Sequence, residues 1–338
     1  MNSREVIERT INFQNPDRLA MDYFLGDHCH SDICCATVES PDAFRSRRIE
    51  SNLELWEDEW NNTWARVATD QTTKGEIYKG AIENWQQLDT YVFPELANAK
   101  LYENVKKVFS KSQDKYNLGF LPGFCFSVAR KLRKLDNFLM DIKLETENVT
   151  ELMRRIEALL ADMMTQYADA GADGILFPED WGTQERLFIS PHDWQEIFKP
   201  SFERLCATAR QHNLTVWMHS CGYTYEIIPH LIEVGIKVLQ FDQPELLGIE
   251  RLGKDFGGKV TFWSPCDIQK ILPTGNMQLI EDSVRRMVQY LAINGGGLIA
   301  KSYGRSFEDL QSIGVKPKCN EFAYQCFIKY SRNVFANN

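Results

Sequence analysis

The stretch 216–222, VWMHSCG, places His219 and Cys221 two residues apart at the end of a short apolar run. A strand that turns into a loop can direct an imidazole and a thiolate with this spacing at one ion. Zn²⁺ accepts nitrogen and sulfur ligands, and a catalytic zinc site leaves one position for substrate. A buried histidine beside an inert cysteine is the alternative interpretation. The position of the pair in the fold decides between the two.

A second group of reactive side chains lies in the stretch 177–184, FPEDWGTQ. Asp180, with Glu179 before it, could orient a substrate or act as an acid or base, because a carboxylate at the mouth of a site is often desolvated and shifted in pKa. A helix cap or a salt bridge is the alternative role for such a carboxylate. Trp181 and Gln184 are candidate contacts to a bound cofactor, although core packing is the alternative for the indole.

The stretch 26–35, GDHCHSDICC, gathers two histidines and three cysteines. Their spacing matches no closed zinc pattern, which favours a loop that lines the mouth of a site. His28 is therefore a candidate contact to a substrate or cofactor, and a metal site in this cluster is the alternative.

These side chains follow or lie between short apolar runs that alternate with stretches of helical spacing. The later runs are nearly continuous in hydrophobicity, as strands covered on both faces must be. The clearest helical pattern covers 149–170, and similar patterns cover 191–211, 224–234 and 279–293. Eight alternations of strand and helix predict an α/β protein, a (β/α)8 barrel. The predicted strands are 19–26, 63–69, 118–125, 174–180, 214–220, 237–243, 259–265 and 297–303.

No linker or compositional break divides the chain, so one domain over 1–338 is expected. Residues 1–16 predict a helix ahead of the first strand. The stretch 71–82, QTTKGEIYKGAI, predicts a small hairpin added after the second strand. A doubly wound α/β sheet is the alternative architecture, but no GxGxxG motif recommends it.

In a barrel of this kind the chemistry sits at the C-terminal ends of the strands, because the βα loops converge there. Carboxylate, thiol and imidazole groups are thus expected to face one mouth. Trp181, Trp263 and Tyr303 would give flat apolar walls suited to a large conjugated ligand. The side chains at or just after the ends of the later predicted strands are Glu179, Asp180, His219, Cys221, Asp242, Gln243, Cys266 and Tyr303.

The composition excludes some classes of partner. The formal net charge is −9, so no global positive field attracts nucleic acid or an anionic membrane surface. The basic run 130–134 predicts a solvated helix face or, alternatively, a contact to an anionic substrate. No stretch has the apolar core of a secretory signal or the roughly 18 apolar residues of a membrane span, so a cytoplasmic protein is expected. Nine cysteines suit reduced thiols.

Longer stretches resemble a known family. The order PEDWGTQ…ISPHDWQEIFKP…VWMHSCGY…IPHLIEVGIKVLQFDQPE…FGGKVTFWSPCDIQKILPTGN…NGGGLIAKSYG resembles the uroporphyrinogen decarboxylase superfamily, and the opening REVIERTINFQNPDRLAMD is similar to its N-terminus. The similarity covers nearly the whole chain and implies a single (β/α)8 barrel. The superfamily includes the decarboxylase of haem biosynthesis and zinc-dependent methyltransferases that take methyl groups from corrinoid proteins.

The decarboxylase branch of the family uses no metal. It holds the acetate side chains of a tetrapyrrole with an arginine-rich RQAGR-type loop after strand one and with a central aspartate. Here strand one runs into GDHC at 26–29, and the arginine loop is missing. Without those cations, a protein of charge −9 is poorly suited to a substrate with eight carboxylates. The housekeeping enzyme of haem biosynthesis is therefore not expected.

The methyltransferase branch carries His-x-Cys at strand five and a further cysteine after strand eight. His219 and Cys221 match the first two zinc ligands, whereas Tyr303 stands where the second cysteine is expected. The resemblance implies that Cys266 or Asp242 completes the shell, and the oxygen of the neighbouring glutamine, residue 243, is a further candidate.

The function that this resemblance implies is zinc-assisted methyl transfer from a methyl-corrinoid donor. Zinc would lower the pKa of an incoming thiol, and the thiolate would attack a methyl group on cobalt. Asp180 and Glu179 would position the acceptor. The expected cofactors are Zn²⁺ and methylcobalamin, the latter carried by a small corrinoid protein as partner.

Two other functions stay open. One is a cofactor-free decarboxylase of a porphyrinogen-like or smaller carboxylic acid, in which Asp180 or Asp58 stabilises a protonated intermediate. The other is a non-catalytic barrel that binds a tetrapyrrole or corrinoid and whose metal site has decayed at Tyr303. Dimers are familiar in the decarboxylase branch, so a homodimer is a further expectation.

Overall fold

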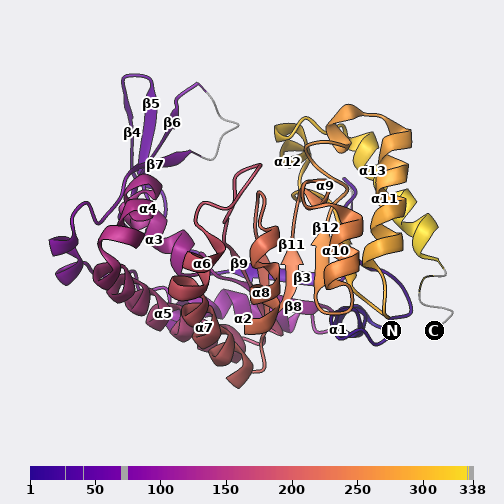
Figure 1. The fold of residues 1–338 in the computed structure, drawn as a ribbon, viewed down its shortest axis with the longest axis horizontal. Helices are drawn as coiled ribbons and strands as arrows, with labels where there is room; N and C mark the ends of the chain where they lie inside the picture. The colour runs from indigo at the N-terminus through magenta and orange to yellow at the C-terminus, as the bar shows by residue number, and fades with distance from the viewer. Residues whose placement is uncertain (27, 41, 70–74, 333, 335–338) are drawn as a thin grey trace.

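The strands of the chain form two separate sheets (Figure 1). The structure, a computed structural model, describes residues 1–26, 28–40, 42–69, 75–332 and 334. The larger sheet has nine strands in the order β2-β1-β13-β12-β11-β10-β9-β8-β3. Their bounds are β1 (Ala20–Phe24), β2 (Cys29–Ser31), β3 (Ile33–Thr37), β8 (Tyr116–Phe120), β9 (Gly174–Pro178), β10 (Thr215–His219), β11 (Ile236–Gln240), β12 (Thr261–Ser264) and β13 (Leu298–Lys301).

This larger sheet is a nearly closed barrel, and its ladders are parallel except the one between β1 and β2. The two terminal strands of the sheet, β2 and β3, are separated in the chain by Asp32 alone. The prediction of an α/β barrel is therefore confirmed. Seven of the eight predicted strands lie in the barrel, as β1 and β8 to β13.

The prediction for the second strand, at 63–69, is wrong. That run forms β6 (Thr63–Val67) in an antiparallel sheet with β4 (Arg45–Glu50), β5 (Leu53–Glu57) and β7 (Glu76–Lys79). All five residues of β6 are partly or fully exposed, whereas a barrel strand must be covered on both faces. The barrel position belongs to β3, so Cys34 and Cys35 lie in a strand and not in a loop.

The expected small hairpin is in fact the edge of this four-stranded sheet. β7 pairs antiparallel with β6, so the two strands of the hairpin are 63–67 and 76–79. The predicted turn residues 71–74 lie outside the described residues. Figure 1 shows the sheet at the upper left, above α3 and α4.

Helices cover the barrel, and the long helix predicted at 149–170 is present as α5. None of the described helices is both long and apolar enough to cross a membrane. The helices are α1 (Ser3–Ile11), α2 (Tyr102–Ser110), α3 (Cys125–Arg133), α4 (Leu135–Leu144), α5 (Thr146–Asp169), α6 (Pro191–Asp193), α7 (Lys199–Gln211), α8 (Ile228–Val234), α9 (Pro244–Leu247), α10 (Ile249–Phe256), α11 (Met277–Leu291), α12 (Phe307–Ser312) and α13 (Pro317–Ser331).

The helix predicted at the N-terminus, α1, closes one end of the barrel. Its side chains Val6, Ile7 and Ile11 are buried in one cluster with inward-facing strand residues such as Trp217. The Arg4 guanidinium binds the Asp173 carboxylate, at 2.5 Å, next to the first residue of β9. Because α1 covers the N-terminal ends of the strands, the C-terminal ends are the open mouth.

The basic run 130–134 is not a solvated helix face. Arg133 is buried, its Nε lies 2.8 Å from an Asp141 carboxylate oxygen, and its guanidinium lies 4.4 Å from the centre of the Trp85 ring. Arg130 is directed at Asp180, with 3.6 Å between the two charged groups. The alternative interpretation, a contact to an anionic ligand, stays open for Lys131.

Asp32 holds the two ends of the barrel sheet together. Its carboxylate accepts two hydrogen bonds from Arg18, of 2.6 and 2.7 Å, and one from the Met21 N–H of 2.9 Å. Its carbonyl oxygen accepts from Tyr116 N–H, at the start of β8. Burial alone would raise the pKa of Asp32, but the hydrogen bonds from Arg18, Ser3 and Met21 lower it below its usual range.

Asp32→Asn is expected to lower the free energy of unfolding at neutral pH by about 2 kcal/mol, because it removes a charge-assisted pair from a buried position. The pKa of Asp32 is lowered in the folded state, so its contribution is present above the unfolded pKa of about 3.9 and is lost as the pH falls through the folded value. Urea denaturation at pH 7 and near pH 2.5 should therefore show a larger acid loss in the wild type than in the variant. The exposed Asp42→Asn should match the wild type. Equal acid losses in all three proteins would contradict this role.

Candidate metal centre

Two adjacent parallel strands, β9 and β10, carry the reactive side chains to one place. Pro178 at the end of β9 pairs with His219 at the end of β10, so the residues that follow both strands leave the barrel side by side. The two loops then touch through glycines. A Cβ on Gly222, whose φ is +79°, would lie 2.1 Å from the Gly182 carbonyl oxygen. Only glycine permits this approach, which brings the loop carrying Asp180 against the loop carrying Cys221.

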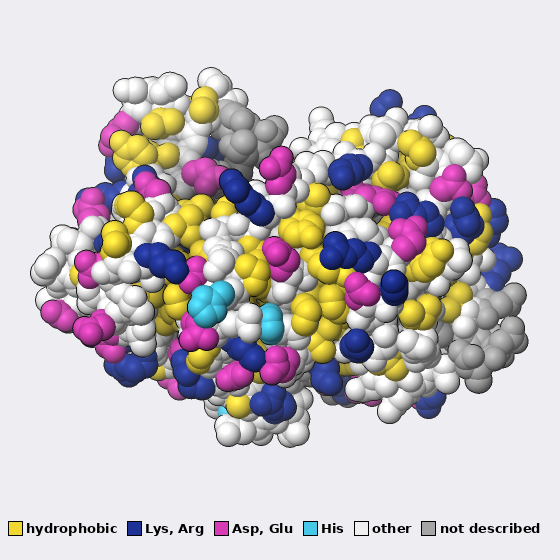
Figure 2. Space-filling view, viewed as in Figure 1, with side chains coloured by type: hydrophobic (Ala, Val, Ile, Leu, Met, Phe, Trp, Pro, Cys, Tyr) yellow, Lys and Arg dark blue, Asp and Glu magenta, His cyan; other side chains and the backbone are white. Residues whose placement is uncertain are grey.

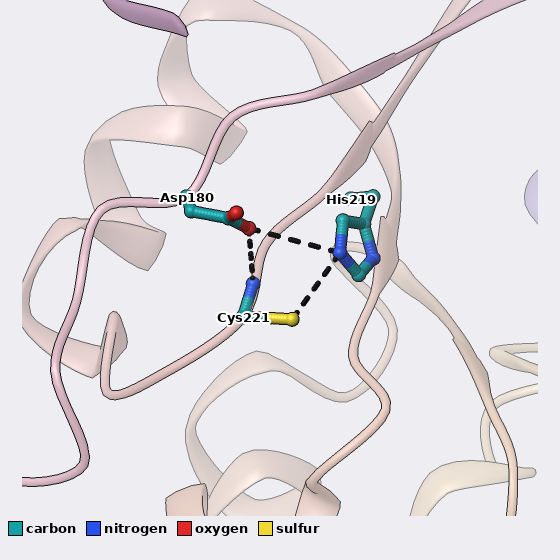
Figure 3. Close-up of side chains that lie close together, drawn as sticks. All are labelled: Asp180, His219 and Cys221. Carbon is teal, nitrogen blue, oxygen red and sulfur yellow. Dashed lines mark hydrogen bonds and ion pairs between the residues drawn. The ribbon is translucent and has the colours of Figure 1, made fainter. Parts of the chain in front are cut away.

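Asp180, His219 and Cys221 form a compact group at this point (Figure 3). Asp180 Oδ1 accepts the Cys221 backbone N–H at 2.8 Å and lies 3.7 Å from His219 Nε2. Cys221 Sγ lies 3.4 Å from the same ring nitrogen. One ligand atom from each side chain therefore lies within 4.8 Å of the other two.

The far side of the His219 ring is held by a second row of polar groups. His219 Nδ1 is hydrogen-bonded to Gln240 Oε1. Gln240 Nε2 donates to Asp242 Oδ1 at 2.7 Å, and Lys301 Nζ donates to the same oxygen at 3.0 Å. Because an amide oxygen only accepts, Nδ1 must carry the proton, which leaves the lone pair of Nε2 directed at the group.

The donor set fits zinc. A catalytic zinc site has three protein ligands drawn from imidazole, thiolate and carboxylate, and keeps a fourth position for water or substrate. Asp180, His219 and Cys221 supply one of each type. The side chain of His219 is 19% exposed and that of Asp180 is 34% exposed, so a ligand in solution can reach them.

The two residues predicted to complete the zinc shell, Cys266 and Asp242, do not belong to the group of Asp180, His219 and Cys221. Cys266 is fully buried, and burial raises the pKa of its thiol far above the usual value. Asp242 pairs with Lys301, and its pKa is lowered: burial would raise it, but the charge of Lys301 and the hydrogen bonds from Lys301 and Gln240 outweigh burial. Both stay predictions as ligands, and the geometry favours Asp180 in their place.

Glu179 faces the opposite way from Asp180. It is fully buried, and its oxygens accept the backbone N–H groups of Phe124, Phe126 and Ser127, at 2.9, 2.9 and 3.2 Å. Burial raises the pKa of this carboxyl group to about 7. The carboxylate therefore holds the start of α3, while its predicted role toward an acceptor stays a prediction.

The other predicted site residues fall into buried and accessible sets. Trp181 is buried and stacks on Phe126 with 4.2 Å between ring centres, and Trp263 is buried in the barrel interior. Gln184 and His28 are exposed. Tyr303 is half-buried, and its pKa is raised by burial and then by Asp242 and Cys221.

Asp58 lies in the turn between β5 and β6 and is not one of the three grouped side chains. One carboxylate oxygen accepts the N–H groups of Trp60 and Asn62, and the other accepts Asn62 Nδ2 and Trp64 Nε1. These four hydrogen bonds fix the turn. A catalytic role for Asp58 stays a prediction.

Sequence patterns did not point to Gln240 or Lys301, and they left Arg130 undecided. A signal for Gln240 exists, because residues two apart in a strand share a face and Asp242 follows Gln240 by two. No local signal exists for the other two pairings. Lys301 and Asp242 are 59 residues apart in the chain, and Arg130 and Asp180 are 50 residues apart.

Asp180→Ala is expected to weaken zinc binding about 10- to 100-fold, because it removes one of three ligands. Competition of the purified protein with a chromophoric chelator measures this. The exposed Asp162→Ala on α5 is the matched control and should bind zinc as the wild type does. Cys266→Ala is also expected to bind zinc normally. A loss of zinc in Cys266→Ala equal to that in Asp180→Ala would instead support the ligand predicted from sequence.

Comparisons with known proteins identify a family and similar folds. The family model described as Uroporphyrinogen decarboxylase (URO-D) matches residues 76–302. A search of curated sequences gave no match. The fold is similar to that of a methyltransferase from Methanosarcina mazei, with a TM-score of 0.58 and 12% identity over 76% of this chain and 73% of that chain.

A B12-independent methionine synthase from Shewanella sp. W3-18-1 has a TM-score of 0.47 and 13% identity, over 82% of this chain and 74% of that chain. At such identities the structural likeness concerns the fold alone. The family model, by contrast, spans residues 76–302, which is more than half of the 338 residues. The chain therefore belongs to the uroporphyrinogen decarboxylase family.

Proposed function

We propose that the protein is a methyltransferase that takes a methyl group from a methyl-corrinoid and uses zinc held by Asp180, His219 and Cys221. The observation that carries this proposal is the set of carboxylate, imidazole and thiol groups within 4.8 Å of one another at the open end of the barrel. The fold shared with a methyltransferase is compatible with it. A small corrinoid-binding protein is the proposed partner, and a homodimer stays a prediction.

Zinc bound there would act as a Lewis acid that lowers the pKa of a thiol acceptor. The protein's own residues supply orientation. Gln240 fixes the His219 ring and its protonated nitrogen, and the Cys221 N–H fixes Asp180 Oδ1. Arg130 lies 3.6 Å from the other oxygen of Asp180 and so helps to orient that carboxylate.

The accessible predicted residues are proposed to contact the corrinoid or the acceptor. Tyr303 is half-buried near Cys221, while Gln184 and His28 are exposed. The hydrogen bond from Gln184 Nε2 to Gln243 Oε1 is long, at 3.5 Å, so breaking it to contact a ligand would cost little. Trp181 is fully buried, so its proposed role is to support the loop of Asp180 from behind.

Charge pairing argues against decarboxylation of a porphyrinogen with many carboxylates. Three cations near the strand ends already face carboxylates: Arg130 faces Asp180, Lys301 faces Asp242, and Arg305 lies 3.2 Å from Asp22. Binding several acetate groups would require these pairs to break. A decarboxylase of a smaller acid is the alternative function, and the activity measurement must distinguish it from a methyltransferase.

Cys221→Ser is expected to lower methyl transfer from methylcobalamin to a small thiol at least about 100-fold, because serine is a poor zinc ligand. The change in the visible absorption of cobalamin follows the reaction. Cys29→Ser, which replaces another exposed cysteine, should react at the wild-type rate.

Removal of zinc with a chelator should abolish the same reaction, and added zinc should restore it. If the protein instead releases CO₂ from a carboxylic acid and this activity survives the chelator, methyl transfer is not its function.

A further inference from the structure

A second site lies between the four-stranded sheet and the barrel. A cavity of about 700 Å³ is lined by residues of β5 and β6, by the segments that follow β3 and β8, and by Lys131 of α3. That volume is typical of a site for a small molecule. In the space-filling view, hydrophobic side chains gather on the lobe formed by the four-stranded sheet, at the upper left (Figure 2).

One wall of the cavity is aromatic. Trp56 and Trp64 are paired across β5 and β6, with ring centres 6.2 Å apart and planes at 10°. Phe44 continues the row, 6.3 Å from Trp56, although its side chain is 69% exposed. The Arg66 guanidinium, which does not line the cavity, lies 5.7 Å from the Trp56 ring centre, an example of a cation beside this indole.

The charges of the cavity have both signs. Lys131 supplies an ammonium group, and within the described part of the chain it has no ion-pair partner. Burial lowers its pKa, so a bound anion would stabilise its charged form. The carboxylates are those of Glu39, Asp58 and Glu59. The oxygens of Asp58 are occupied by the four donors of its own turn, so Glu39 and Glu59 are the acidic groups left to face a ligand.

We propose that this cavity binds a betaine, a small zwitterion that carries a quaternary ammonium group and a carboxylate. The ammonium group lies against the indoles of Trp56 and Trp64 near Glu59, and the carboxylate pairs with Lys131. A primary ammonium would lose its hydrogen bonds with water against a wall of ring carbons, whereas a quaternary one has none to lose. A simple anion could pair with Lys131, but it would leave the negative charges of Glu39 and Glu59 without a cation in the cavity.

The betaine site is separate from the metal group but close to it. Lys131 follows Arg130 in α3, and Arg130 faces Asp180. The binding does not require zinc, so calorimetry on the metal-free protein tests it without reference to methyl transfer.

Glycine betaine is the probe, and two analogues remove one charge each. In 3,3-dimethylbutanoate a carbon replaces the nitrogen at the same shape, and choline lacks the carboxylate. Glycine betaine should bind with one-to-one stoichiometry, and each analogue should bind about tenfold more weakly. Equal affinity for betaine and either analogue would overturn the proposal, as would no binding of betaine.

Two variants assign the charges to their partners. Lys131→Met should weaken betaine about tenfold and leave choline unchanged, because only the carboxylate contact is lost. Trp64→Leu should weaken betaine and choline about fivefold and spare 3,3-dimethylbutanoate. Lys106→Met, at an exposed lysine of α2, is the matched control and should change nothing.

Melting temperatures identify a variant that fails to fold. Phe44→Leu replaces Trp64→Leu in that case, since the Phe44 ring is exposed and its loss affects stability little. Wild-type affinity for betaine in folded Lys131→Met would overturn the proposal.

Discussion

The parallel pairing of β9 with β10 is the constraint on which the candidate site depends. It sets Pro178 opposite His219, and the contact of Gly182 with Gly222 then brings the two following loops together. A shift of one residue in this ladder would turn the side chains to the other face of the sheet. The carboxylate, imidazole and thiol would then no longer converge.

The two ends of the barrel have different roles: the N-terminal end stabilises the fold, and the C-terminal end carries the candidate site. Helix α1 fills the N-terminal end with Val6, Ile7 and Ile11, and Asp32 ties the ends of the sheet together. The C-terminal end carries a set of buried polar groups that bind one another: Gln240 and Lys301 both donate to Asp242. Such pairing lets charged groups remain in a barrel mouth at low cost.

The four-stranded sheet adds a surface that a plain barrel lacks. It brings an aromatic wall to the ends of β3 and β8, opposite Lys131. It also explains why the run 63–69 was wrongly placed in the barrel. Hydrophobic alternation marks a strand, but it does not say which sheet the strand joins, and β3 lies in a cysteine-rich stretch that was interpreted as a loop.

The sequence by itself determined the barrel class, seven of the nine strands in the barrel sheet and the pairing of His219 with Cys221, because these depend on periodicity and spacing between near neighbours. Only the tertiary structure decided which group joins that pair. Asp180 lies 39 residues from His219 in the chain, and the sequence indicated Cys266 or Asp242 as the further ligand instead. Ladder register and the approach of two glycines, which local patterns do not encode, place Asp180 there and leave Cys266 buried.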